Sequence, residues 1–198
     1  LLSMSSGLDW VENYKRPISV TSKSYYGKDL LSLILSRRFI SEPGKKYKYL
    51  SGNTQLLGVV LERATGMSVS SYASASLWSP IGAVNRASWA LDSEFGLEKT
   101  FCCFNSSARD FSKIGLLLLN GGRAYNNPVI DSTYLNWLFS MPYLIDDDNK
   151  NRKGSVVDYY SNGWWFASVL GKDVLYARGF RGQYLVIIPD LNIVFVRL

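Results

Sequence analysis

Apolar positions recur at helical spacing through the first two thirds of the chain and alternate with polar positions in the last third. One helical pattern occupies KDLLSLILSRRF, and Pro43-Gly44 follows it. A second runs from Leu56 to Ala64, with Gly66 placed to end it. Such i, i+3, i+4 spacing predicts amphipathic helices, each packing one face on a core.

Further helices are predicted from capping residues. Serine at the start of an apolar pattern satisfies the unpaired backbone N–H groups of the first helical turn. On this basis Ser68 begins a helix, and Ser106 or Ser107 begins another that ends near Asn120-Gly121-Gly122. The predicted ranges are Val69–Trp78, Ala108–Leu118 and Ser132–Phe139.

The last third is typical of an antiparallel sheet. Short aromatic and β-branched segments alternate with glycine, proline and aspartate, which favour tight connections. The predicted strands are Trp164–Val169, Val174–Arg178, Gln183–Ile188 and Ile193–Val196. Helices followed by a sheet predict the α+β class. We expect one domain over 1–198, with a helical part at about 1–140 and a sheet part at about 160–198.

Composition and charge limit the kinds of molecule that the chain is expected to bind. The chain has 198 residues, of which 47% are hydrophobic, and a net charge of +6. No uncharged apolar stretch reaches the roughly 18 residues of a transmembrane helix. The basic clusters at 45–48 and 149–153 are short, and acidic residues precede the second one. We therefore expect no nucleic-acid partner and no transmembrane segment, and we expect the loop Asp146–Gly154 to be mobile.

The absence of histidine restricts the chemistry. It excludes a Ser-His-Asp triad or a Cys-His dyad within these residues and disfavours a catalytic zinc, so we expect no metal and no cofactor. Acid–base chemistry would need Tyr, Lys, Asp or Glu.

Cys102 and Cys103 are adjacent. We expect them to be two small core residues that do not bridge, because the ring would strain the peptide between them.

Tyr49 and Ser51, in KYKYLSGNTQLLG, are candidate catalytic residues. A phenol titrates near pH 10, and nearby cations such as Lys45, Lys46 and Lys48 would lower its pKa and make it a proton acceptor. The alternative is an aromatic side chain packed before a helix. Ser51 would share a proton network with Tyr49, or it would cap a helix that begins near Asn53 or Thr54.

The stretch ARGFRGQYLVIIPD holds the second candidate group. Gly179 and Gly182 flank Phe180 and Arg181 just before a predicted strand. This pattern predicts a hairpin turn. It would also allow the Gln183 backbone N–H to hold an oxyanion and Arg181 to bind a carboxylate, although an exposed turn arginine is the simpler interpretation.

Several segments, in order along the chain, resemble the serine β-lactamase-related family. This group includes class C β-lactamases, penicillin-binding-protein-like esterases and 6-aminohexanoate-dimer hydrolases. The segments are LLSMSSGLDW, PGKKYKYLSGNTQLLGVVLERATG, SYASASLWSPIGA, SSARDFSKIGLLLLNGG and YARGFRGQYLVIIPDLNIVFV. The resemblance implies a β-lactamase/transpeptidase-like fold and a serine hydrolase that forms an acyl-enzyme from a small ester, amide or peptide-like substrate.

The resemblance also assigns roles to residues. Tyr49 matches the tyrosine that assists proton transfer at the nucleophile, and Ser51 takes a position often held by asparagine. Phe180, Arg181 and Gly182 occupy the place of the Lys-Thr-Gly or His-x-Gly motif. Gln183 matches the position whose backbone N–H contributes to the oxyanion hole. Relatives are often periplasmic or attached to the cell envelope, and the same location is expected here.

Two departures from the family pattern qualify these roles. Phe180 replaces a lysine or histidine, so it can neither tune the tyrosine nor bind a β-lactam carboxylate. No lysine in the chain has a serine three residues before it, so the family's Ser-x-x-Lys nucleophile motif is missing. We therefore expect a fold incomplete at both ends and a chain that is inactive alone. The alternative is a catalytically dead member that serves as a binding or peptidoglycan-sensing module.

Overall fold

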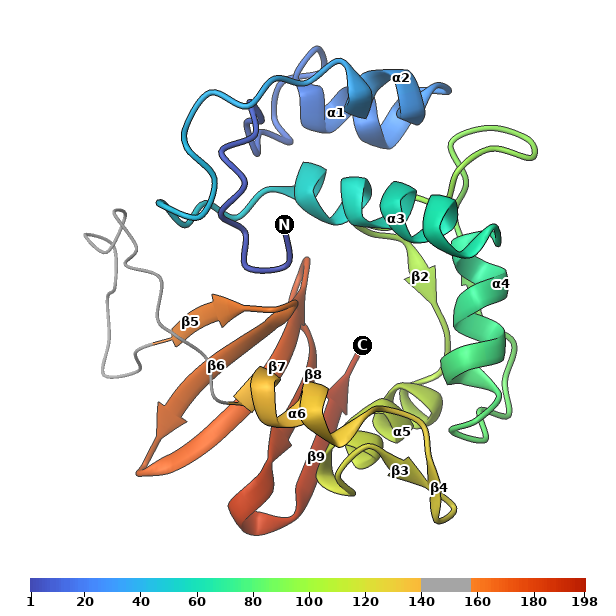
Figure 1. Cartoon of the computed structure of the whole chain (residues 1–198), viewed down its shortest axis with the longest axis vertical. Helices are drawn as coiled ribbons and strands as arrows, with labels where there is room; N and C mark the ends of the chain where they lie inside the picture. Colours follow the sequence, from blue (N-terminus) through green and yellow to red (C-terminus); the bar gives the residue numbers. More distant parts are fainter. Residues whose placement is uncertain (140–157) are drawn as a thin grey trace. The chain divides into compact units, whose positions relative to one another are not determined.

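A computed structural model describes residues 1–139 and 158–198 (Figure 1). The predicted mobile loop Asp146–Gly154 and the second basic cluster lie outside the described residues. The described residues form two compact units. Unit 1 comprises 1–73 and 87–105, and unit 2 comprises 74–86, 106–139 and 158–198. Each is treated by itself below, and the expected single domain over 1–198 stays a prediction.

Unit 1 is mainly helical. Its helices are α1 (Val20–Tyr26), α2 (Leu30–Leu35), α3 (Ser51–Thr65) and α4 (Val69–Ala73), and a short antiparallel pair joins β1 (Ser88–Trp89) to β2 (Phe104–Asn105). Its core is a buried cluster of Leu8, Trp10, Ile34, Leu50 and Val59. Trp10 reaches this core because α3 has a glycine beside it: a Cβ on Gly52 would lie 2.6 Å from the indole.

The helix signals of unit 1 are largely confirmed. Gly66 ends α3 in the left-handed conformation, with φ of 68°, and Ser68 accepts the Ser71 N–H at 3.2 Å at the start of α4. The predicted helix Val69–Trp78 is regular only to Ala73 and continues as the π-helix η1 (Ser74–Trp78). Helix α1 was not predicted, because its sequence VTSKSYY buries Thr21, Ser22 and Ser24 instead of an apolar stripe.

Unit 2 contains the predicted meander as a five-stranded antiparallel sheet in the order β5-β6-β7-β8-β9 (Figure 1). The strands are β5 (Asp158–Ser161), β6 (Trp164–Val169), β7 (Lys172–Gly179), β8 (Gln183–Ile188) and β9 (Ile193–Arg197), and the 3-10 turn η3 (Pro189–Leu191) joins the last two. Together with the helices, this sheet confirms the α+β class. Strand β5 extends the prediction by one strand.

Helices α5 (Ala108–Leu119) and α6 (Ser132–Phe139) supply the other side of the unit 2 core. Both helices match their predicted ranges closely. A hairpin of β3 (Arg123–Ala124) and β4 (Asn127–Pro128) connects them. The buried cluster contains Leu118, Leu135, Leu138, Phe166, Leu175 and Ile187. Helix α5 lies close to β9 because Gly115 has no side chain: a Cβ there would lie 2.6 Å from Cγ1 of Val194.

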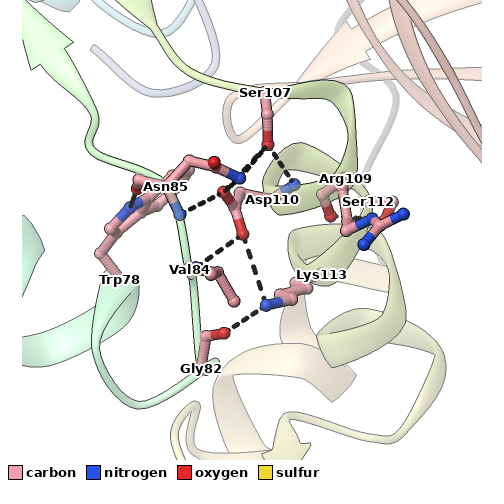
Figure 2. Close-up of polar contacts among 9 residues, drawn as sticks. All are labelled: Trp78, Gly82, Val84, Asn85, Ser107, Arg109, Asp110, Ser112 and Lys113. Atoms are coloured by element: carbon pink, nitrogen blue, oxygen red, sulfur yellow. Dashed lines mark hydrogen bonds and ion pairs between the residues drawn. The ribbon is translucent and has the colours of Figure 1, made fainter.

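The first turn of α5 is tied to an earlier segment by one carboxylate (Figure 2). Asp110 is fully buried. Its oxygens accept the backbone N–H groups of Val84 and Asn85, each at 2.9 Å, and the Asn85 amide at 2.8 Å. Ser107 caps the helix through the Asp110 N–H at 3.1 Å, and Lys113 pairs with the carboxylate at 3.3 Å.

These contacts stabilise the ionised form of Asp110. The Val84 N–H, followed by the Asn85 and Ser107 donors, outweighs the cost of burial and holds the pKa of the carboxyl well below its ordinary 3.8. A carboxyl with a depressed folded-state pKa stabilises the fold fully above its unfolded value. That stabilisation is lost as pH falls below 3.8 toward the folded-state pKa.

Replacing this carboxylate is expected to destabilise the chain. Asp110→Asn places an amide NH₂ against N–H donors, so we expect the Tm at neutral pH to fall by roughly 5–10 °C. The variant should also lose less stability than the parent between pH 4 and pH 2, because it has no charge to neutralise there. Thermal unfolding followed by circular dichroism measures both effects. Asp190→Asn, which removes an exposed pair with Lys172, is the control and should change Tm little.

The close approach of α5 to β9 gives a second prediction. Alanine favours helices over glycine by about 1 kcal/mol, but overpacking costs about 1–3 kcal/mol. We expect Gly115→Ala to lower the free energy of unfolding by about 1–2 kcal/mol in urea titrations. Arg109→Ala, at an exposed position of the same helix, should be nearly neutral. A Gly115→Ala protein more stable than the parent would contradict the close packing.

Candidate functional site

The segment before α3 is fixed by the first residues of the chain. The Gly44 N–H donates to the Ser5 carbonyl at 2.7 Å, and the Lys48 N–H donates to the Met4 carbonyl at 2.8 Å. The Lys48 ammonium group donates to the Trp10 carbonyl at 3.3 Å. LLSMSSGLDW and KYKYLSGN are therefore side by side in unit 1, although some forty residues separate them in sequence.

Tyr49 lies at the end of this segment, immediately before α3. Its side chain is 41% exposed, whereas the neighbouring Leu50 is 1% exposed and belongs to the core. The core residue under the helix start is therefore Leu50, and Tyr49 is only partly covered. The predicted catalytic role of Tyr49 stays a prediction.

Ser51 is the first residue of α3, not the cap of a later helix. Leu50 occupies the N-cap position and makes no side-chain cap bond. The predicted cap of a helix beginning near Asn53 or Thr54 is therefore wrong. The helix starts earlier because a side chain distant in sequence satisfies its first N–H: the Ser51 backbone N–H donates to Oε1 of Glu12.

The Ser51 hydroxyl completes a short chain of hydrogen bonds. Its Oγ donates to Oε2 of Glu12 at 3.2 Å and lies 3.4 Å from the Tyr14 hydroxyl. An ionised carboxylate only accepts, so the direction of the chain is determined. Glu12 accepts from Ser51, and Ser51 then accepts from Tyr14. The arrangement orients the Ser51 hydroxyl and keeps the proton on Tyr14.

The pKa of Tyr14 is raised above its ordinary value. Partial burial raises the pKa of Tyr14 above 10.0, the Ser51 hydrogen bond opposes this, and the Glu12 carboxylate raises the pKa further by charge repulsion. Glu12 and Tyr14 were missed by sequence reasoning. Their contacts with Ser51 span 39 and 37 residues, and no local motif marks such a pairing.

The second predicted group lies in unit 2, at the β7–β8 connection. Gly179 pairs with Gln183, and the turn between them has positive φ at Arg181 (63°) and Gly182 (86°). The predicted hairpin turn is confirmed. Phe180 is 76% exposed, and the Arg181 guanidinium, also exposed, lies 5.6 Å from the centre of its ring. The roles expected of Gln183 in holding an oxyanion and of Arg181 in binding a carboxylate stay predictions.

The prediction for the cysteines is wrong. Cys102 and Cys103 form a disulfide with each other, and both are half-buried instead of lying in the core. The peptide between adjacent cysteines accommodates the ring because Cys103 adopts a left-handed backbone conformation, with φ of 67°.

Two features absent from the described residues concern metal binding and membrane crossing. Within 1–139 and 158–198, no three or more Cys, Asp or Glu side chains gather in a way that could hold a metal ion. In the same ranges, no helix has the length and apolar character needed to cross a membrane.

Comparison with known proteins agrees with the sequence resemblance. The family model described as Beta-lactamase matches residues 1–198. A 6-aminohexanoate-dimer hydrolase of Paenarthrobacter ureafaciens is 25% identical over 214 residues, covering 100% of this chain and 53% of that protein. The chain thus spans about half the length of this curated relative.

Solved structures show the same fold. A Bacillus anthracis protein assigned as a 6-aminohexanoate-dimer hydrolase superposes with a TM-score of 0.77 at 23% identity, covering 98% of this chain and 53% of that one. A penicillin-binding protein from Bacillus halodurans gives a TM-score of 0.69 at 18% identity, covering 98% and 65%. With a family match along its whole length and this fold, the chain belongs to the beta-lactamase family.

Proposed function

We propose that this chain is part of a serine hydrolase that cleaves a small ester or amide through an acyl-enzyme. The observation that carries the proposal is the start of α3, where exposed Tyr49 lies two residues from Ser51. Ser51 is itself held by Glu12 and Tyr14. Membership of the beta-lactamase family supports it. The Paenarthrobacter relative, named for hydrolysis of an amino-acid dimer, favours an amide substrate.

The two tyrosines have different proposed tasks. Tyr49 is the group that exchanges a proton with the nucleophile. Tyr14 keeps its proton, since its hydroxyl donates to Ser51 and its pKa is raised. Glu12 and Ser51 are positioning residues that fix the backbone at the helix start, and thereby the direction of the preceding Tyr49. The roles predicted for Phe180, Arg181, Gly182 and Gln183 in binding substrate remain part of the same proposal.

The nucleophile is proposed to lie outside residues 1–198, because no Ser-x-x-Lys occurs in them.

The second candidate function is that of a catalytically dead family member that binds a ligand. The exposed Phe180 favours it, since this side chain supplies an apolar surface where the family pattern has a cation. Reaction with a fluorophosphonate separates the two: a longer protein that contains this chain should be labelled at a serine if it is an enzyme.

Removing the phenol of Tyr49 tests the proposal directly. In such a longer protein, Tyr49→Phe should lower kcat/KM for p-nitrophenyl acetate and for the linear 6-aminohexanoate dimer by about 10²–10⁴-fold. Proton transfer accounts for the loss, since the ring is retained. Tyr26→Phe is the control, because Tyr26 is 80% exposed on α1 and should leave turnover unchanged.

The chain tested by itself is expected to be inactive. Residues 1–198 alone should not turn over p-nitrophenyl acetate or a chromogenic β-lactam above the buffer rate. Turnover by this chain that disappears in Tyr49→Phe would show that the missing serine is dispensable. A labelled longer protein whose turnover survives Tyr49→Phe would remove Tyr49 from the mechanism.

The proposed contact between Glu12, Ser51 and Tyr14 predicts how the pKa of Tyr14 responds when Glu12 is replaced. Glu12→Gln removes the negative charge that repels tyrosinate, so the pKa of Tyr14 should fall toward its ordinary value. Tyrosine Cζ resonances followed by NMR between pH 8 and pH 12 measure this, with the Tyr14 signal assigned from Tyr14→Phe. Glu94→Gln, at an exposed position of unit 1, should leave that signal unchanged. An unchanged or raised Tyr14 pKa in Glu12→Gln would contradict the arrangement.

A further inference from the structure

The Cys102–Cys103 disulfide has no place in the hydrolytic site proposed above. It closes a small ring made of both Sγ, both Cβ and both Cα atoms together with the peptide C–N bond between them. Both residues are half-buried, so the disulfide lies outside the core. They are also the only cysteines in the chain. Cys103 has a φ of 67°, in the left-handed region that residues other than glycine adopt uncommonly.

The backbone of this ring is an anchor for its surroundings. The carbonyls of Lys99 and Cys102 both accept the indole N–H of Trp89, at 3.0 and 2.8 Å. The Cys103 carbonyl accepts the Ala90 N–H at 3.1 Å and the Asn105 amide at 3.0 Å. A change in the backbone at Cys102–Cys103 therefore disturbs a tryptophan and the β1–β2 pairing.

The same loop is bonded to helix α3. The Thr100 N–H donates to Oε1 of Gln55 at 2.9 Å, and its hydroxyl donates to the Thr54 carbonyl at 2.9 Å. Gln55, which is 1% exposed, donates in turn to the Glu98 carbonyl at 3.0 Å. Gln55 lies one helical turn after Ser51, so the contacts that fix the loop reach the first turns of α3.

We propose that Cys102–Cys103 is a reversible redox site that takes dithiol reductants and whose reduction loosens the loop 98–105. A thiolate of the dithiol attacks one Sγ, the S–S bond breaks, and a mixed disulfide forms. This attack releases the other cysteine as a thiolate, and the second thiol of the reductant then displaces the first cysteine from the mixed disulfide; each cysteine thiolate takes up one of the two protons that the dithiol gives up. The protein gains two thiols, and the reductant leaves as its own disulfide. Cys103 is then free to return to a more populated backbone region.

The experiment uses the 198-residue chain without denaturant. After purification under non-reducing conditions, iodoacetamide should add nothing. After dithiothreitol it should add two carbamidomethyl groups, at Cys102 and Cys103. Removal of the reductant and addition of oxidised glutathione should restore the unreactive form. Reduction should change the tryptophan fluorescence and raise amide hydrogen exchange at Thr100 and Cys102 by about tenfold or more.

Two variants identify the source of each signal. Trp89→Phe should abolish the fluorescence change while keeping the thiol count. Cys102→Ser/Cys103→Ser should show the faster exchange at Thr100 permanently and no response to dithiothreitol. The same reductant should leave the far-UV circular dichroism of the parent unchanged, which shows that the chain stays folded.

The outcomes that overturn the proposal are equally defined. Free thiols in the non-reduced chain would show that the ring does not form. A disulfide that opens only in denaturant would show that it is structural. Release of both thiols without any change in Trp89 emission or in exchange at Thr100 would show that the ring does not constrain the loop. None of these results depends on hydrolysis, so the failure of this proposal and that of the proposed function are distinguishable.

Discussion

Unit 2 depends on a single buried charge. Asp110 lies in the first turn of α5, yet it accepts three hydrogen bonds from Val84 and Asn85, so the carboxylate connects a helix to a segment made much earlier in the chain. Ser107 accepts the Asp110 backbone N–H, and Lys113 pairs with the Asp110 carboxylate. The helix fixed in this way is also the one that Gly115 allows close to β9. The position of α5 on the sheet thus rests on one residue that must be charged and one that must be small.

A carboxylate also organises the first turn of α3, and there it accepts a hydrogen bond from a hydroxyl group as well as from the backbone. Glu12 accepts from both the backbone and the side chain of Ser51, and this imposes one donor direction on the residues around it. Two phenols near the same helix start therefore differ in character. Tyr14, which is 59% exposed, hydrogen-bonds to Ser51, whereas Tyr49, which is 41% exposed, lies immediately before the helix.

Much of the fold could be predicted because its signals are local. The helix ends at Gly66 and Ser107 and the strands between Trp164 and Val196 follow from spacing and from residues with strong backbone preferences. Helix α1 could not be predicted, since it buries hydroxyl groups that bond to nearby carbonyls. The site was predicted only in part, from resemblance. Tyr49 and Ser51 lie in a recognisable segment, but Glu12 and Tyr14 meet Ser51 only through the tertiary fold. The bond between Cys102 and Cys103 was misjudged, since sequence spacing does not show that the backbone at Cys103 turns left-handed.

The division of the described residues into two units has a consequence for biosynthesis. Unit 2 takes residues 74–86 from the middle of the stretch that otherwise builds unit 1. On the ribosome these residues emerge before α5, so the N–H groups of Val84 and Asn85 exchange water for their native acceptor only after Asp110 has been translated. Unit 1 likewise needs residues 87–105 before it is complete. Neither unit can finish folding as one contiguous nascent segment, and no single proteolytic cut would release either of them whole.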